Sequence, residues 1–203
     1  MKPKIFIPVI IACLLMTGGL CSADLYYQHV ATIGNWNTEI GIVNTSPAQN
    51  VTGVFRAFND DGEPVSAPVS VTLFPEGRAE FLVNESFTDS EEIGYIVFDT
   101  DSGCPTGYMK YFINDRFRAA LPVESFAGNE NLIIPHIAWD QQFETGISLL
   151  NTTDSTKTLE FIFNNGERRV ISLGPRNHTA FMIENLLNHP PQPDIQSAVI
   201  DGS

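Results

Sequence analysis

Thr38-Glu39-Ile40-Gly41-Ile42-Val43-Asn44-Thr45 returns in this chain as Thr145-Gly146-Ile147-Ser148-Leu149-Leu150-Asn151-Thr152, 107 residues further on. The same offset relates His29-Val30-Ala31 to His136-Ile137-Ala138, and Trp36 to Phe143. Self-similarity at a fixed offset is the signature of a duplicated structural unit. We therefore interpret the chain as two copies of one fold.

Both copies consist of short apolar runs separated by turn signals about every 8 to 12 residues, which is typical of an all-β sandwich or barrel. No segment shows a convincing helical pattern. One run, Ile93–Phe98, is apolar on both faces and is expected to be a central, buried strand. The other strands expected in the first copy are Tyr26–Ala31, Thr38–Val43, Val51–Phe58, Val69–Leu73, Ala79–Val83, Tyr108–Ile113 and Phe117–Pro122.

The second copy repeats this order only in part. Ile195–Ile200 matches Ile93–Phe98, and nothing after it corresponds to the last two strands of the first copy. The sequence thus predicts two tandem immunoglobulin-like β-sandwich domains, the second lacking its last strands. The expected divisions are a signal peptide over residues 1–23, a first domain over 24–124, a linker over 125–131 and a second domain over 132–203.

The missing strands lead to an expectation about the end of the second copy. If the last two strands of the first copy pair with Ile93–Phe98, then the absence of their counterparts leaves the strand at Ile195–Asp201 as an open apolar edge. Such an edge is a template for another strand. A neighbouring domain could lend the strand, or the gene could continue past Ser203. A second molecule could also insert one, giving strand-mediated self-association through Ile195–Asp201.

Residues 1–23 have the pattern of a secretory signal peptide. Lys2 and Lys4 precede an apolar run of about a dozen residues, which is too short to span a bilayer. Small residues in Cys21-Ser22-Ala23 favour cleavage before Asp24. The expected location is secreted or periplasmic, and the alternative is a lipid anchor on Cys21. No later apolar run is long enough to span a membrane.

The formal net charge is −13, from 11 basic and 24 acidic residues. A surface of this sign repels phosphate backbones and anionic lipids, and no basic stripe overrides it. The composition therefore argues against a nucleic-acid partner and favours a soluble, acidic protein.

No catalytic motif in the sequence is complete. The chain lacks G-x-S-x-G, H-E-x-x-H, C-x-x-C and a glycine-rich phosphate loop after a strand. Asp101-Ser102-Gly103 matches the turn of aspartic proteases, but the second copy reads Asp201-Gly202-Ser203. Aspartic-protease chemistry needs a carboxylate from each half, so this match is incomplete. Since none of these motifs is complete, we expect no catalytic residue, no metal site and no cofactor.

Aromatic side chains are the candidates for ligand binding. Tyr26, Tyr27, Trp36 and Trp139 could each stack on the face of a sugar ring. The alternative for Trp36 is architectural, because an aromatic residue before a strand can close one end of a sandwich.

The repeated polar residues are expected to be structural. Asn44 and Asn151 follow equivalent strands and would tie turns through their side chains. His29 and His136 would pack at sheet ends and bond backbone carbonyls, as would His178 and His189, which have no matching histidine in the first copy.

The repeated residues, from His29-Val30-Ala31 to Asn44-Thr45 and from His136-Ile137-Ala138 to Asn151-Thr152, resemble tandem β-sandwich repeats of secreted bacterial proteins of unknown function. The resemblance implies a fold and a compartment and brings no activity. We expect a non-catalytic extracytoplasmic structural, adhesion or binding module whose partner is a protein or a glycan. The alternatives are a carbohydrate-binding module using exposed aromatics and a secreted hydrolase with an unrecognised site.

Overall fold

The computed structural model describes residues 24–114, 116–125, 131–138, 144–190 and 192–202. The predicted signal peptide, Cys21 and Trp139 lie outside these residues. Most of the described elements are strands, which confirms the prediction of an all-β fold. No helix among the described residues is long and apolar enough to cross a membrane.

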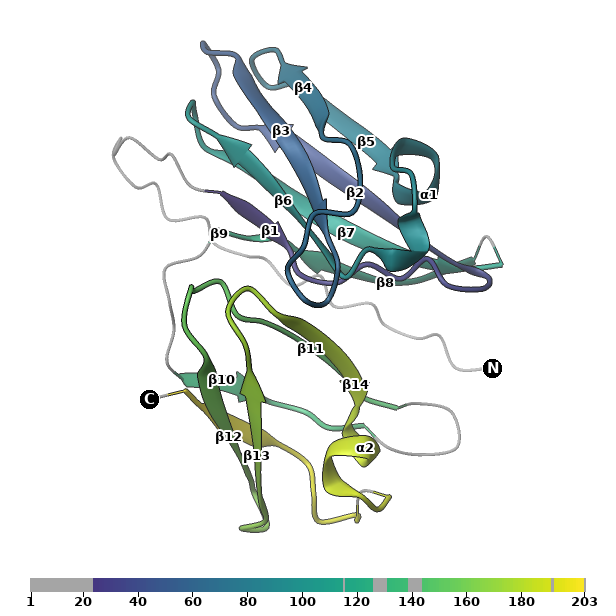
Figure 1. Cartoon of the computed structure of the whole chain (residues 1–203), viewed down its shortest axis with the longest axis vertical. Coiled ribbons are helices and arrows are strands. Elements are labelled where there is room, and N and C mark those ends of the chain that lie inside the picture. The colour runs from purple at the N-terminus through teal and green to yellow at the C-terminus, as the bar shows by residue number, and fades with distance from the viewer. Residues whose placement is uncertain (1–23, 115, 126–130, 139–143, 191, 203) are drawn as a thin grey trace, which may run out of the picture.

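Two antiparallel sheets pack face to face in the first copy (Figure 1). In one sheet the order is β4-β3-β6-β1-β9, and in the other it is β5-β2-β7-β8. The strands are β1 (Leu25–Tyr27), β2 (Trp36–Asn44), β3 (Val51–Phe58), β4 (Val69–Leu73), β5 (Arg78–Leu82), β6 (Tyr95–Thr100), β7 (Pro105–Ile113), β8 (Arg116–Pro122) and β9 (Glu124–Ser125).

One core lies between these sheets. Phe55 and Phe98 contribute to it from one sheet, and Ile40 and Met109 contribute from the other. The sequence alternates on β3 because every second residue faces this core. β6 is central and almost wholly buried, as predicted.

The second copy has its own sheets and its own core. Its sheets have the orders β10-β15-β12-β13 and β11-β14, and Phe161, Phe163 and Ile200 are buried between them. The strands are β10 (Asn131–Ile134), β11 (Gly146–Leu150), β12 (Lys157–Phe163), β13 (Arg168–Leu173), β14 (His178–Met182) and β15 (Ala198–Asp201).

Two short helices were not expected from the sequence. α1 (Val83–Ser86) follows β5 directly, and α2 (Ile183–Leu187) follows β14 at the matching point of the repeat. Each begins with a buried apolar residue, Val83 or Ile183, so the chain turns while remaining anchored in the core. A single 3₁₀ turn, η1 (Ser90–Glu92), precedes β6.

The prediction of an open edge at Ile195–Asp201 is wrong. β15 is flanked by β10 and β12, as β6 is flanked by β1 and β3. The strands that lack a counterpart belong to the other sheet, because β7 pairs with β2 and β8 pairs with β7. Among the described residues, no strand lies beside β11 in the place that β7 occupies beside β2.

A repeated threonine fastens the segment that enters β2 and β11. The Thr38 hydroxyl accepts the Ala31 amide at 2.9 Å and donates to the Ala31 carbonyl at 3.0 Å. Thr145 makes the same two bonds to Ala138 at 2.8 and 3.1 Å. These bonds explain why the threonine recurs in both copies, whereas they use only the backbone of Ala31 and Ala138.

A repeated asparagine closes the end of the same strands, as predicted. Each side-chain amide nitrogen donates to three backbone carbonyls at 2.7–3.4 Å, and each oxygen accepts the amide two residues further on. Both asparagines are buried. The carbonyls belong to Gln49, Leu73 and Phe74 for Asn44, and to Ser155, Leu173 and Gly174 for Asn151.

Candidate functional site

The two units contact each other through the turn after β3 and the outer face of β11 and β14. The His178 amide donates to the Asp60 carbonyl at 2.8 Å, and His178 Nδ1 lies 2.6 Å from Asp60 Oδ1. The Ser148 hydroxyl donates to the Gln28 carbonyl at 3.0 Å. The contact is therefore polar, and it includes both backbone and side-chain hydrogen bonds.

Two glycines allow this close approach. A Cβ at Gly94 would lie 2.3 Å from Asp60 Oδ1 and 2.9 Å from His178 Nδ1. Gly62 has φ +82°, and a Cβ there would lie 2.8 Å from the Cβ of Arg176. A larger side chain at either position would push the two units apart.

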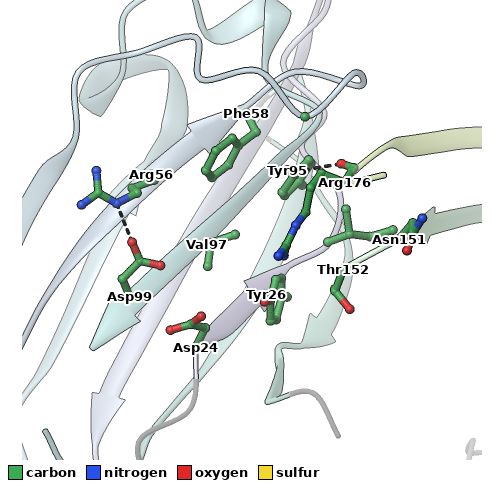
Figure 2. A pocket seen from close by; sticks show the side chains of 12 residues that line it. Asp24, Tyr26, Arg56, Phe58, Tyr95, Val97, Asp99, Asn151, Thr152 and Arg176 are labelled. Atoms are coloured by element: carbon green, nitrogen blue, oxygen red, sulfur yellow. Dashed lines mark hydrogen bonds and ion pairs between the residues drawn. The ribbon is translucent and has the colours of Figure 1, made fainter. Parts of the chain in front are cut away.

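A pocket of about 210 Å³ opens between the two units (Figure 2). The first unit lines it with the rings of Tyr26, Phe58 and Tyr95, and the second unit adds Arg176. Leu150, Asn151 and Thr152 complete the side that the second unit contributes.

Charged groups are paired around this pocket. Arg56 Nε donates to Asp99 Oδ2 at 2.5 Å, and Arg176 Nε donates to Asp154 Oδ1 at 2.9 Å. Asp24 also lines the pocket, and burial together with the Asp99 carboxylate raises its pKa. The pocket therefore presents fixed donors and acceptors of both signs.

The phenols of the pocket are neutral hydrogen-bonding groups. Burial raises the pKa of Tyr95 to about 12, and burial together with the Asp24 carboxylate raises the pKa of Tyr26. The Tyr95 hydroxyl donates to the Arg176 carbonyl at 3.1 Å, and the Tyr95 ring stacks on Phe58 with centroids 5.1 Å apart. The aromatic wall is thus held in place from both units.

The structure separates the aromatic residues that the sequence proposed as binding candidates. Tyr26 lines the pocket, whereas Tyr27 is fully buried and its hydroxyl donates to the Gly41 carbonyl at 3.0 Å. Trp36 is 40% exposed at the start of β2 and does not line the pocket. Trp139 falls outside the described residues.

Ser148, His178 and Asp60 have the connectivity of a serine-hydrolase triad. His178 Nε2 lies 2.9 Å from Ser148 Oγ, and Nδ1 lies against Asp60. A nucleophilic serine must give its proton to the histidine. Here the Ser148 hydrogen goes to the Gln28 carbonyl, so the hydroxyl accepts a hydrogen bond from Nε2. The three side chains thus form a structural contact between the units.

His29 packs beside this chain of hydrogen bonds. Its ring stacks on that of His178 with centroids 5.6 Å apart, and the Tyr111 hydroxyl donates to its carbonyl at 3.0 Å. Burial and, secondarily, the proximity of His178 lower the pKa of His29 to about 4. The expected bond from a histidine ring to a backbone carbonyl is found for His189. His178 bonds side chains instead, and the buried Nδ1 of His29 has no hydrogen-bond partner among the described residues.

Differences between the copies are the signal that could have revealed this contact. Ser148 occupies the position of Gly41, and His178 occupies that of Arg78, because Val43 pairs with Arg78 as Leu150 pairs with His178. Both substitutions lie on the outer face of their sheet. A search for outward positions at which the repeat is broken would have selected them.

No group of three or more histidine, cysteine, aspartate or glutamate side chains within the described part of the chain is placed to hold a metal ion. No protein-family model matches this chain, and no curated protein matches it significantly.

Proposed function

We propose that this protein is a non-catalytic, extracytoplasmic binding module whose ligand site is the pocket between its two β-sandwich units. The observation that carries the proposal is the convergence of aromatic rings and paired charges from both copies on one pocket. The signal-peptide pattern of residues 1–23 supports the compartment.

The chemistry of the pocket suits a glycan. A sugar ring offers an apolar face to an aromatic side chain and a rim of hydroxyls to charged and amide groups. Tyr26 and Phe58 supply rings, and the Arg56–Asp99 pair and Arg176 supply donors and acceptors. Drug-sized ligands fill pockets of about 300–1,000 Å³, so this smaller site suits a single sugar unit.

The site is preformed because the contact between the units positions it. Tyr95 and Arg176 are joined across the interface, and Gly62 brings the first unit against the backbone of the second. A ligand held by both units binds the folded pair and not the unfolded chain, so it stabilises both units together.

Titration calorimetry against a panel of soluble glycans tests the proposal. Tyr26→Ala and Arg176→Ala should each weaken binding about 10-fold or more, since each removes a pocket contact worth about 1.4 kcal/mol or more. Trp36→Ala is the matched control, because it removes an exposed aromatic outside the pocket and should leave affinity unchanged. The absence of any glycan ligand, or loss of binding only in Trp36→Ala, would overturn the proposal.

A hydrolase is the second candidate, favoured only by the Asp60–His178–Ser148 connectivity. A fluorophosphonate probe reacts with activated serine nucleophiles and distinguishes the two functions. We expect no labelling, because the Ser148 hydroxyl is engaged by Gln28. Labelling that disappears in Ser148→Ala would replace the binding module with an enzyme.

A further inference from the structure

A stacked pair of histidine rings lies at the contact between the two units. His29 of the first unit packs on His178 of the second, with ring centroids 5.6 Å apart and 24° between the planes. The His178 side chain is 2% exposed, and its Nδ1 and Nε2 atoms lie 2.6 Å from Asp60 and 2.9 Å from Ser148. His178 therefore covers His29 and is itself held by both units.

The His29 ring lacks the hydrogen bonds that hold the His178 ring. Its Nδ1 atom is buried and has no hydrogen-bond partner among the described residues. A protonated imidazole has two N–H donors, and burial of a charge without partners is costly. The stacked arrangement therefore accommodates His29 as a neutral ring and disfavours its protonated form.

Four titratable side chains face His29 or the ring that covers it. Asp60 comes from the turn after β3, Tyr95 from β6, Tyr111 from β7 and His178 from β14. Burial raises the pKa of Tyr95 to about 12 and also raises the pKa of Tyr111, so both phenols stay neutral in acid. Burial and the proximity of His178 lower the pKa of His29 to about 4, against a smaller opposing effect of the Asp60 carboxylate.

We propose that protonation of His29 separates the two units in acid and thereby opens the pocket between them. In the open arrangement His178 has moved away, so water solvates the charged His29 ring. The units themselves stay folded, because each has a hydrophobic core of its own. At neutral pH the ring loses its proton and the units close again.

The pocket shares its contact with the histidine pair. The Tyr95 ring lies 6.2 Å from the His178 ring, and its hydroxyl donates to the Arg176 carbonyl at 3.1 Å (Figure 2). Arg176 precedes His178 by two residues, so the second unit cannot withdraw one from the first unit without the other. Release of a bound glycan in acid rests on the proposed function, whereas opening of the contact does not.

Linkage gives the direction and the size of the effect. The pKa of His29 is about 4 in the closed arrangement and returns towards its ordinary value of 6.5 in the open one, so the open arrangement binds the proton more tightly. Above pH 6.5 the contact is unaffected. Below it, the ratio of open to closed molecules rises by up to about 10-fold for each pH unit until the pH nears 4.

Amide hydrogen exchange of the full chain, followed by NMR without ligand at about pH 7 and about pH 4.5, tests the opening. The reporter is the His178 amide, which donates to the Asp60 carbonyl of the other unit at 2.8 Å. After correction for the intrinsic rate, its protection should fall at least about 10-fold at the lower pH. The Asn44 and Phe163 amides bond carbonyls of their own units and should remain more protected than His178 at both pH values.

His29→Gln removes the group that takes up the proton, so protection of the His178 amide should no longer depend on pH. His29→Phe keeps an aromatic ring on His178 and should behave in the same way, which provides a second variant if the glutamine chain does not fold. His189→Gln is the matched control, because its ring bonds the Pro190 carbonyl away from this contact, and it should retain the full pH dependence.

An unchanged pH dependence in His29→Gln or His29→Phe would assign the acid sensitivity to other groups and overturn the proposal. Equal protection of His178, Asn44 and Phe163 at the lower pH would overturn it as well, because the units would then unfold together instead of separating. Calorimetry with a bound glycan should show weaker affinity at the lower pH for the original chain only. If no glycan binds at any pH, the proposed function fails, and the exchange measurements still decide whether the contact opens.

Discussion

The outer face of the sheet that contains β2 and β5 serves a different purpose from the outer face of its counterpart, β11 and β14. In the first copy this face is a surface where Lys110 Nζ contacts Glu39 at 2.5 Å, Glu80 bonds Tyr108, and Tyr108 covers Gly41. In the second copy the same face carries Ser148 and His178 and docks on the first unit.

The inner faces differ much less. Phe55 and Phe161 are both fully buried, and the Thr38 and Thr145 bonds are the same in kind and nearly the same in length. Packing restricts what an inner residue can become, because a core tolerates little change in volume. Outward residues are less restricted, and two that differ between the copies, Ser148 and His178, make the contact between the units.

Truncation of the equivalent core phenylalanines is the strongest test of this equivalence. Phe55→Ala and Phe161→Ala should each cost about 3–5 kcal/mol, because each removes a fully buried ring. Urea unfolding monitored at amides of both units should show which unit each variant destabilises. Phe81→Ala, at a half-buried ring, is the control and should cost less. A loss below about 1 kcal/mol for either buried ring would contradict the common core.

Replacement of the repeated asparagines tests whether the two turns are fastened equally. Asn44→Ala and Asn151→Ala should each cost about 2–3 kcal/mol, since each leaves several buried backbone groups without a partner. Chemical denaturation measures the loss. Thr45→Ala, at the exposed neighbour, removes a single hydrogen bond from the Thr45 hydroxyl to the Cys104 carbonyl at 2.7 Å and should cost only about 1 kcal/mol or less. If Asn151→Ala leaves the free energy of unfolding unchanged, the two turns are not fastened equally.

Acid titration should reveal the buried environment of His29 in the first copy. The pKa of His29 falls from 6.5 to about 4 on folding, so between these pH values the unfolded chain binds a proton that the folded chain does not. Stability should be fully present above pH 6.5 and fall by about 2–3 kcal/mol as the pH approaches 4.

Thermal unfolding of His29→Gln across this pH range should show a shallower loss than the original chain. Identical pH profiles for His29→Gln and the original chain would show that His29 is not responsible.

The repeat made much of the fold predictable. A constant offset related β2 to β11, and apolar runs between turn signals located most of the strands of the first copy. The role of Asn44 was also predictable, because a short polar side chain after a strand has few uses other than closing a turn.

Sheet order was not predictable in the same way. β6 and β7 are consecutive in the sequence, but the turn between them carries the chain from one sheet to the other. The sequence alone favoured pairing of neighbours, which placed an open edge on β15, whereas β15 is flanked by β10 and β12.

The pocket was mostly hidden because its residues come from both units. Tyr26 and Tyr27 are adjacent and look alike in sequence, yet one lines the pocket and the other lies in the core. Neighbouring residues of a strand face opposite sides of the sheet, so the sequence indicates that only one of the two faces inward. It does not indicate which one, because that depends on the sheet that β1 joins. Arg176 was not predictable because its contact with Tyr95 joins residues 81 positions apart.

The buried asparagines have a consequence for production of the protein. Asn44-Thr45-Ser46 and Asn151-Thr152-Thr153 are acceptor sequences for N-linked glycosylation, together with those at Asn50, Asn84 and Asn177. The amide nitrogen that would carry the sugar is the one that donates to three carbonyls in each turn. In a host that glycosylates secreted chains, folding and modification would compete for the same atom. Chains modified at Asn44 or Asn151 before folding would lack a closed turn, so yield would depend on which process acts first.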